Sequence, residues 1–464
     1  MTAAAELAAP LEDLRDPLLR LETLADPGSL TVAVHGDGVA TARARLDGAP
    51  AILFATDPRV QGGAVGARGA DRVVAAYDDA LAQGLPVVGV WQSGGARLRE
   101  GVASLDGMGR IFAAMVRASG TVPQISLVLG PAAGGAAYGP ALTDVVVTGP
   151  EARVFVTGPD VVRSVTGEDL TAEALGGPAV VAASGVSHLS GRTQEEAIAQ
   201  TRRVVGLLAR RSMPVALHDR PDPGPLLPAS PRRAYDVRPV LDALLDEPLL
   251  ALQPTWAPNV VTGLGRLEGR TVGIVATNPL RLGGCLTASA SEKAARFVRL
   301  CDGLGIPLVV VVDVPGYLPG GRQETDGVVR RGAKLLHAFA AARVPRVTVI
   351  TRKAYGGAYI ALNSRSLGAT RVLAWPGAQV DVMSPVAAVR VLRRRDLAAL
   401  LPHQREAAEA TYADEHAVTT GGTGRALADG LIDEVVEPAD TRAAVAAALA
   451  AAPAARGRLT NIPL

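Results

Sequence analysis

The stretch Val122-Pro-Gln-Ile-Ser-Leu-Val-Leu-Gly-Pro-Ala-Ala-Gly134-Gly135-Ala136 returns in altered form as Val344-Pro-Arg-Val-Thr-Val-Ile-Thr-Arg-Lys-Ala-Tyr-Gly356-Gly357-Ala358. Each copy is an apolar run that ends in a Gly-Gly-Ala turn, and the turns lie 222 residues apart (356 − 134). This pattern indicates an internal duplication. Because paired glycines after a buried strand let the backbone approach a ligand and aim its N–H groups at negative charge, the turns predict a site that holds two oxyanions.

The duplication extends upstream, and its pattern predicts the fold class. The apolar run 87–90, which ends in Trp91-Gln92-Ser93-Gly94-Gly95, is expected to match the run 309–312, which ends in Asp313-Val314-Pro315-Gly316, at the same offset. In the first copy we expect buried strands over 85–90 and 124–129 with a helix over 101–119 between them. Continuous apolar strands that alternate with helices indicate sheets covered on both faces, an α/β class.

The length of the chain predicts two domains. With 464 residues, of which 48% are hydrophobic, it can bury a large core and is too long for one ordinary domain. Five prolines fall within residues 220–233, which is typical of a linker. We therefore predict an N-terminal domain over 1–220 and a C-terminal domain over 234–464. Near the end of the chain, Asp440 is expected to cap an alanine-rich helix over 441–452.

The composition limits the classes of partner and the compartment. A formal net charge of +2 predicts neither nucleic acid nor a membrane surface as a partner. The two cysteines, Cys285 and Cys301, are too few for a disulfide framework and no metal-binding motif is present, so we expect a cytoplasmic protein without a bound metal. The start of the chain does not match a signal peptide, and no run of about 18 uncharged apolar residues predicts a membrane span.

Lysine is rare in this chain. Three lysines, Lys293, Lys334 and Lys353, stand against 44 arginines. Where arginine is used almost everywhere, a retained lysine points to a site that needs a compact point charge, which a planar guanidinium does not supply. Chance among so few residues explains the distribution equally well.

Both Gly-Gly turns are followed by residues that predict a helix, beginning near Ala136 and Ala358. The free N–H groups and the dipole at a helix N-terminus would stabilise an oxyanion such as a thioester enolate. The alternative is that the glycines only let a helix and a strand pack closely. The repetition of the turn in both halves favours the catalytic interpretation.

The loop over residues 92–101 is the other candidate for ligand binding. Its Gly94-Gly95 turn would cradle a phosphate or a pantetheine chain, and Arg97 and Arg99 would supply charge-assisted hydrogen bonds unless they are ordinary solvated arginines. The loop matches neither a P-loop nor the dinucleotide motif. None of the six histidines lies beside a Gly-Gly turn and no serine elbow is present, so an enzyme of this sequence must rely on backbone donors and a cofactor.

Several longer segments form an ordered pattern along the chain. They are Gln92-Ser-Gly-Gly-Ala-Arg-Leu-Arg-Glu-Gly, Gly130-Pro-Ala-Ala-Gly-Gly-Ala-Ala-Tyr-Gly-Pro-Ala-Leu-Thr-Asp144, Phe155-Val-Thr-Gly-Pro-Asp160, Val165-Thr-Gly-Glu168, Ser291-Glu-Lys-Ala-Ala-Arg-Phe297, Val312-Asp-Val-Pro-Gly316, Gly332-Ala-Lys334, Ile350-Thr-Arg-Lys-Ala-Tyr-Gly-Gly-Ala-Tyr359 and Asn461-Ile-Pro-Leu464. Over about residues 50–464 the chain resembles the carboxyltransferase (beta) subunits of biotin-dependent acyl-CoA carboxylases, of the acetyl-/propionyl-CoA carboxylase type.

The resemblance implies two duplicated crotonase-like domains of the ββα-spiral type in a homo-oligomer, usually a hexamer, whose active sites lie between the N-domain of one subunit and the C-domain of another. It implies transfer of a carboxyl group from carboxybiotin to the α-carbon of a short-chain acyl-CoA through an enolate. The coenzyme A thioester would lie on the N-domain. Biotin, as carboxybiotin on a separate carrier from the biotin carboxylase/biotin carrier (alpha) subunit, would lie on the C-domain.

The resemblance also assigns the site residues. By position, Gly134 and Gly135 would hold the thioester oxyanion, and Gly357 and Ala358 would hold the ureido oxygen of biotin. The residues expected to contact the acyl-CoA are Gly94, Gly95, Ala96, Arg97, Ala133, Ala136, Tyr138 and Ile360. The residues expected to contact biotin are Gly316, Tyr355, Gly356 and Tyr359. In the implied mechanism the ureido nitrogen takes the α proton, and no histidine is needed.

The chain departs from the family pattern at a few positions. Gln92 stands where the family usually has aspartate, and Pro385, in the segment 384–388, is expected to remove a backbone donor from a loop that is usually glycine-rich. Ile360 favours acetyl-/propionyl-type acceptors. The alternatives on the same fold are a decarboxylase of malonyl-type thioesters, a carboxylase of a pathway-specific acceptor, and a non-catalytic subunit of a carboxylase complex.

Overall fold

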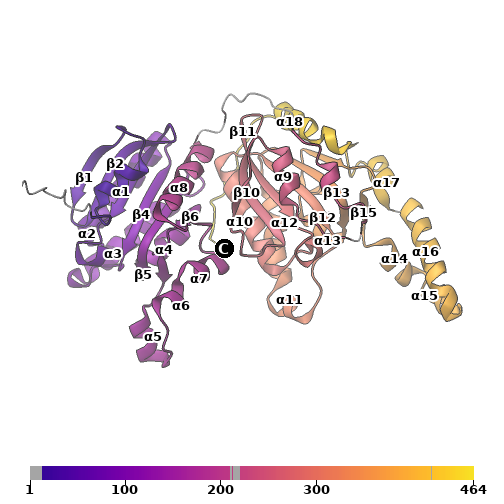
Figure 1. Cartoon of the computed structure of the whole chain (residues 1–464), viewed down its shortest axis with the longest axis horizontal. Coiled ribbons are helices and arrows are strands. Elements are labelled where there is room, and N and C mark those ends of the chain that lie inside the picture. Colours follow the sequence, from indigo (N-terminus) through magenta and orange to yellow (C-terminus); the bar gives the residue numbers. More distant parts are fainter. Residues whose placement is uncertain (1–12, 210–211, 213–219, 232, 420, 464) are drawn as a thin grey trace, which may run out of the picture. The chain divides into compact units, whose positions relative to one another are not determined.

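The computed structural model describes residues 13–209, 212, 220–231, 233–419 and 421–463. The chain divides into two compact units (Figure 1). Unit 1 comprises residues up to 118 together with 124–180 and 190–205, and unit 2 comprises 119–123, 181–189 and the chain from 206 onward. The domain boundary in the proline-rich segment stays a prediction, and residues 213–219 and 232 of that region lie outside the described residues.

Unit 1 is built on an eight-stranded sheet with the order β1-β2-β3-β4-β5-β6-β8, in which β7 pairs with β5. Its strands are β1 (Thr31–Gly36), β2 (Val39–Leu46), β3 (Ala49–Thr56), β4 (Val87–Ser93), β5 (Gln124–Ala133), β6 (Val145–Thr148), β7 (Arg153–Phe155) and β8 (Leu189–Ser190). The helices that accompany them are α1 (Pro17–Leu24), α2 (Ala67–Gln83), α3 (Val102–Ala118), α4 (Gly135–Leu142), α5 (Pro159–Thr166), α6 (Ala172–Gly176), α7 (Pro178–Ala183) and α8 (Gln194–Ala209).

Unit 2 repeats this sheet with the order β16-β14-β13-β12-β11-β10-β9, in which β15 pairs with β13. Its strands are β9 (Leu250–Leu252), β10 (Val260–Leu267), β11 (Arg270–Thr277), β12 (Leu308–Val314), β13 (Arg346–Tyr355), β14 (Arg371–Ala374), β15 (Gln379–Asp381) and β16 (Glu434–Val435). Its helices are α9 (Arg238–Leu244), α10 (Ala288–Leu304), α11 (Gly321–Thr325), α12 (Val328–Ala341), α13 (Gly356–Ala361), α14 (Pro385–Leu392), α15 (Arg394–Ala399), α16 (Pro402–Thr419), α17 (Gly422–Ala428) and α18 (Thr441–Ala451).

The alternation of strands and helices confirms the predicted α/β class and the duplication. In each unit the first pairings are antiparallel, as in β2·β3 and β10·β11, and the following ones are parallel, as in β4·β5 and β12·β13. A parallel pair needs a crossover, and α3 and α12 occupy these connections in the chain. The crossover brings the end of the second parallel strand, where each Gly-Gly turn lies, beside the end of the first.

Matching side-chain contacts support the duplication at the first hairpin of each unit. The two-residue loops Asp47-Gly48 and Glu268-Gly269 all have positive φ, the conformation that lets a tight hairpin follow the strand twist. The Asp26 carboxylate accepts the two loop amides of unit 1 at 3.0 and 2.8 Å. In unit 2 the Asp246 carboxylate accepts the equivalent amides at 2.9 and 2.7 Å.

The offset between the two copies is not constant, which corrects the predicted alignment. β5 and β13 are 222 residues apart, but β4 and β12 are 221 apart. The hydrogen bonds agree, since Val65 donates to the Gly95 carbonyl at 2.8 Å and Leu286 donates to the Gly316 carbonyl at 3.0 Å. Gly316 is therefore the counterpart of Gly95, not of Gly94, and Asp313 is the counterpart of Gln92.

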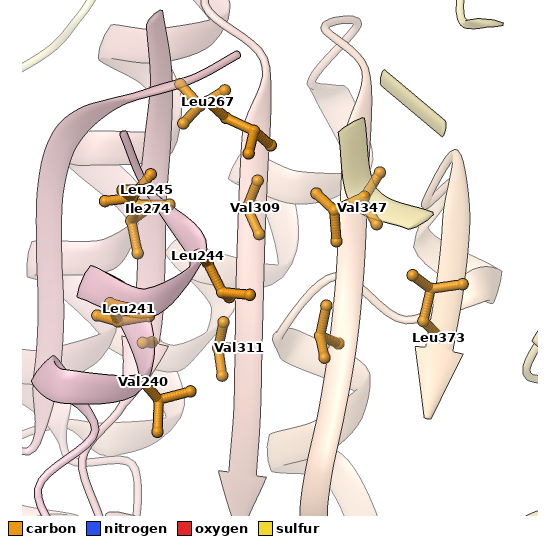
Figure 2. Packing of buried hydrophobic residues seen from close by; sticks show 14 of the residues in the cluster. Val240, Leu241, Leu244, Leu245, Leu267, Ile274, Val309, Val311, Val347 and Leu373 are labelled. Carbon is orange, nitrogen blue, oxygen red and sulfur yellow. The ribbon is translucent and has the colours of Figure 1, made fainter. Parts of the chain in front are cut away.

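One hydrophobic cluster fills the space between the unit 2 sheet and α9. Val240, Leu241 and Leu244 of the helix are buried against Val309 and Val311 of β12, as Figure 2 shows. The apolar run over 308–312 has no alternation because every residue of β12 is buried, as expected for a strand covered on both faces. This rigid packing fixes the end of β12 and, beside it, the end of β13.

The sixth residue of α2 and of α10 is a cation in both units, but the surroundings differ. Arg72 forms an ion pair with Asp37 at 2.7 Å and a long hydrogen bond to the Val39 carbonyl at 3.4 Å. Its counterpart Lys293 is only 1% exposed. The three N–H bonds of its ammonium reach the carbonyl oxygens of Gln253, Trp256 and Val260 at 2.9, 2.9 and 2.8 Å. Burial lowers the pKa of Lys293 to about 7.

Candidate functional site

The first Gly-Gly turn joins β5 to α4 in unit 1. Gly134 has a φ of +57°, in the left-handed region that favours glycine. Its own amide donates to the carbonyl oxygens of Phe155 and Val156 at 3.3 and 3.1 Å. The amides of Gly135 and Ala136, the first two residues of α4, have no acceptor within the part of the chain that the structure describes. The first turn therefore presents two adjacent backbone donors at the start of a helix.

The loop after β4 packs directly against this turn. A side chain on Gly95 would begin 2.8 Å from the Ala133 carbonyl oxygen and 3.4 Å from the Gly135 amide nitrogen, so only glycine allows the approach. The Gly94 amide donates to the Gly62 carbonyl at 3.1 Å. Ala96 forms a bridge to Val65. The structure thus brings Gly95, Ala133, Gly135 and Ala136 together, as the predicted acyl-CoA site requires.

Arg97 is engaged within the chain. Its guanidinium forms an ion pair with Glu100 at 2.9 Å and donates to the carbonyl oxygens of Asp37 and Ala64 at 3.0 and 3.2 Å. These contacts hold the loop in place, and we do not include Arg97 among the proposed ligand contacts. Tyr138, on α4, is 51% exposed and its side chain is open to a ligand or another protein.

The second Gly-Gly turn repeats the geometry between β13 and α13 in unit 2. Gly356 has a φ of +56°, and a side chain on it would begin 2.7 Å from the Val382 carbonyl oxygen. Gly357 is exposed, and no atom lies within 4 Å of the place where its side chain would begin. Among the described residues, no acceptor takes the amides of Gly357 and Ala358. Gly357 and Ala358 correspond to Gly135 and Ala136 at the 222-residue offset.

A cavity of about 400 Å³ opens at the second turn. Its lining includes Gly356, Gly357, Tyr359, Ile360, Val380, Asp381, Val382, Gly421, Gly422 and Arg425. Burial raises the pKa of Tyr359 to about 12, so its hydroxyl keeps its proton at neutral pH. This buried hydroxyl has no hydrogen-bond partner among the described residues. Ile360 is 45% exposed and supplies an apolar wall.

Of the other predicted biotin contacts, Tyr355 directly precedes the cavity-lining Gly356, whereas Gly316 is not among the lining residues. Tyr355, the last residue of β13, is buried, and its hydroxyl donates to the side-chain oxygen of Gln379. Burial raises the pKa of Tyr355 to about 12, and the charges of Asp381 and Asp313 act in the same direction. Gly316 follows β12 with a φ of +147°. Gly356 and Tyr359 line the cavity itself.

An ion pair at the second turn was missed in the sequence. His416 Nε2 lies 3.2 Å from Asp381 Oδ2, although the histidine is 60 residues beyond Gly356 (416 − 356). In the structure, Asp381 of β15 lies opposite Tyr355 in the parallel register, and no sequence motif indicated this contact. His188, by contrast, is structural, since burial, assisted by the charges of Arg296 and Lys293, lowers its pKa to about 3.

The segment 384–388, which follows β15 and departs from the family pattern, begins the helix α14. The Ser384 hydroxyl accepts a hydrogen bond from the Ala387 amide at 3.4 Å, and Pro385 is the first residue of α14. A proline costs little there because the first helical amide has no partner within the helix. The donor that Pro385 lacks is therefore one that a helix start would leave unused.

Comparison with known proteins identifies the family. The model of the carboxyl transferase domain matches residues 19–461. The chain belongs to the carboxyl transferase family. The biotin-dependent acetyl-/propionyl-coenzyme A carboxylase beta6 subunit of Mycobacterium tuberculosis is 56% identical over 460 residues, covering 97% of each chain. The propionyl-CoA carboxylase beta chain of Rhodococcus erythropolis is 53% identical over 465 residues, again covering 97% of each.

A solved structure of the same family supports the fold. The transcarboxylase 12S hexamer with bound methylmalonyl-coenzyme A superimposes with a TM-score of 0.90 at 38% identity, covering 97% of this carboxyl transferase and 92% of that chain. The expected pair of crotonase-like domains is confirmed. Within the described residues, no helix combines the length and apolarity needed to cross a membrane.

Proposed function

We propose that this chain is the carboxyltransferase subunit of a biotin-dependent acyl-CoA carboxylase that carboxylates acetyl- or propionyl-CoA. The observation that carries the proposal is the pair of Gly-Gly turns, each with two adjacent backbone amides that have no acceptor among the described residues. Two oxyanions arise in this reaction, the thioester enolate and the ureido group of biotin. One pair of amides is available for each.

The first turn holds the acyl-CoA thioester in this proposal. The sequence suggested Gly134 and Gly135 as donors, but the Gly134 amide is already engaged with Phe155 and Val156. The donors are therefore Gly135 and Ala136. A proton α to a thioester is weakly acidic, and donors aimed at the enolate oxygen bind its charge more strongly in the transition state than in the substrate. Because Gly95 has no side chain, the loop after β4 can lie directly against the turn.

The second turn holds the ureido group of carboxybiotin. The cavity of about 400 Å³, the open amides of Gly357 and Ala358 and the unpaired Tyr359 hydroxyl fit a polar ring system that needs donors. Bound carboxybiotin would supply CO2 when its N–C bond breaks, and the ureido nitrogen left behind would supply the base for the α proton, so that the enolate carbon could form the new bond to CO2. Gly357 and Ala358 stabilise the negative ureido oxygen throughout.

The substrate class and the partners complete the proposal. We place the short acyl chain of the acceptor against the exposed apolar side chain of Ile360, beside the carboxybiotin at the second turn, although one methylene discriminates by only about 1–3 kcal/mol. Carboxybiotin arrives on the carrier of a biotin carboxylase/biotin carrier (alpha) subunit. The hexameric assembly of the transcarboxylase 12S relative suggests a hexamer here as well, and the low cysteine content suggests a cytoplasmic location.

A decarboxylation assay tests this function. The purified chain is incubated with malonyl-CoA or methylmalonyl-CoA, with and without free biotin, and the decarboxylated acyl-CoA is measured. We expect turnover that depends on biotin. Turnover without biotin would instead identify a decarboxylase of malonyl-type thioesters. No turnover with either substrate would overturn the proposal in favour of a different acceptor or a non-catalytic subunit.

A further inference from the structure

The ion pair between Asp381 and His416 lies beside the second turn, where Asp381 lines the cavity. Asp381 ends β15 and lies opposite Tyr355 in the parallel register. The carbonyl oxygen of the next residue, Val382, lies 2.7 Å from the point where a side chain on Gly356 would begin. The pair is well shielded from water, since the histidine side chain is 14% exposed and the aspartate side chain is 8% exposed.

The carboxylate of Asp381 is held from a second side by the segment that follows α16. A side chain on Gly421 would begin 2.3 Å from Asp381 Oδ2, so the backbone lies directly on the carboxylate. Gly421 and Gly422 line the same cavity as Gly356 and Gly357. The pair is thus a polar link between the helix α16 and the wall of the cavity.

Unit 1 has no such charge at the equivalent position. Phe155 of β7 lies opposite Ala133, where unit 2 has Asp381 opposite Tyr355. A carboxylate beside an oxyanion site opposes binding by like-charge repulsion. The other carboxylate of the cavity wall, Asp429, is paired with Arg425 at 2.7 Å. Both acids of the lining therefore have a cationic or ionisable partner.

We propose that His416 is a positioning residue of the second turn. Its imidazole lies 3.2 Å from the Asp381 carboxylate and neutralises it when protonated, and it holds α16 and residues 421–422 against β15, so that the amides of Gly357 and Ala358 face a cavity without excess negative charge. This inference rests on the proposed function, because it assumes that the second turn binds the ureido group. The histidine itself makes no contact with a substrate.

Three variants separate charge compensation from simple support. His416→Gln leaves the carboxylate uncompensated, and we expect the kcat of the biotin-dependent decarboxylation to fall by about tenfold or more. The apparent KM for free biotin rises, while the apparent KM for malonyl-CoA stays unchanged. In the double variant Asp381→Asn with His416→Gln no charge remains, and we expect kcat to return to within about threefold of the wild type. Single Asp381→Asn serves as the reference for the loss of the acid alone.

A matched control lies on the same hairpin. Arg390 of α14 forms an ion pair with Glu409 of α16 at 2.8 Å, away from the cavity lining. Arg390→Gln loosens the hairpin without changing the charge at the turn, and kcat should stay within about twofold. A double variant no more active than His416→Gln, an equal loss in Arg390→Gln, or a raised KM for malonyl-CoA would each overturn the inference. Wild-type protein without biotin-dependent turnover would overturn the proposed function and this inference with it.

Discussion

The two Gly-Gly turns share a backbone but differ in their surroundings. Gly134 and Gly356 have φ values of +57° and +56°, and each is followed by two amides without an acceptor among the described residues. The first turn is bordered by Phe155, whereas the second is bordered by the ion pair of Asp381 and His416. The duplication has therefore kept the positions of the main-chain donors while the electrostatic setting of each turn has changed.

The largest difference that mutation should show concerns activity rather than stability. Gly357→Val fills open space, since no atom lies within 4 Å of the new Cβ. It should lower the kcat of biotin-dependent decarboxylation by about 10²–10³-fold by blocking the amides, with no change in the melting temperature. Gly135→Val should lose as much activity but also some stability, because the new Cβ meets Met108 at 2.9 Å.

Gly109→Val is the matched control for both. Gly109 is an exposed residue of α3 whose Cβ position is also open, and we expect normal kcat. Full activity in Gly357→Val would refute the role of the second turn while leaving the first untouched.

The next largest expected difference is in the free energy of unfolding when the equivalent cations Lys293 and Arg72 are replaced. Lys293→Met leaves three buried carbonyl oxygens without their donor, and we expect the free energy of unfolding to fall by about 2–4 kcal/mol. Arg72→Met removes an ion pair and one long hydrogen bond, and the loss should stay below about 1 kcal/mol. Urea unfolding of both variants measures the difference. Equal losses would mean that the lysine makes no special contribution.

The lysine also predicts a dependence of stability on pH. Its pKa in the folded chain is about 7, while an unfolded lysine titrates near about 10.4. Between these values the unfolded chain holds a proton that the folded chain has released, so the free energy of unfolding rises with pH across this window. The rise should be smaller in Lys293→Met when urea unfolding is compared at pH 7, 8 and 9. Parallel curves for the two proteins would contradict the lowered pKa.

Replacing Gly134 or Gly356, which both have a positive φ, by alanine should lower stability by different amounts. Gly134→Ala meets no neighbouring atom, and the positive φ alone should cost about 1–2 kcal/mol. Gly356→Ala adds a contact of 2.7 Å with the Val382 carbonyl, so its loss of stability should exceed that of Gly134→Ala. Chemical denaturation of the two alanine variants gives the order directly. The reverse order would show that β15 moves away from the turn at little cost.

The smallest expected effect concerns the helices α1 and α9, which occupy equivalent places. Asp16 caps α1 by accepting the Leu18 amide at 2.8 Å, whereas Val237 at the start of α9 has no side-chain cap. Asp16→Ala should lower the free energy of unfolding by about 1 kcal/mol. Asp440→Ala is the control, because Asp440 makes no capping hydrogen bond to α18, and it should change stability by less than about 0.5 kcal/mol. A larger loss in the control would argue against the capping role.

Much of the fold could be predicted because the signals are local. The apolar runs and Gly-Gly turns placed β4, β5 and β13, and the alanine-rich segment placed α18, which ends at Ala451. Asp440 stands at the N-cap of α18 as predicted, but it ends the 3-10 turn Pro438–Asp440 in a helical conformation, and its side chain makes no capping hydrogen bond. The position of the helix start was therefore predictable, whereas the missing hydrogen bond was not.

The alignment of the two halves shows a second limit of prediction from the sequence. Gly94-Gly95 and Pro315-Gly316 match equally well by eye, and only the hydrogen bonds of Val65 and Leu286 fix the one-residue slip. His416 could not be placed at all, because its contact with Asp381 depends on how α16 returns to the sheet. The retained Lys293, by contrast, fits the expectation of a compact charge, since three carbonyl oxygens converge on one nitrogen.

The amides of Gly135 and Ala136 belong to residues without a functional side chain, and this has a pharmacological consequence. Reagents that alkylate imidazoles and thiols, or acylate hydroxyls, find no target in such a pair of donors. An inhibitor directed at the first turn has to succeed by shape and by presenting a carbonyl or enolate mimic. Resistance would then arise mainly from neighbours such as Met108, whose side chain lies against the turn, because among the residue types only proline lacks the backbone N–H that serves as donor.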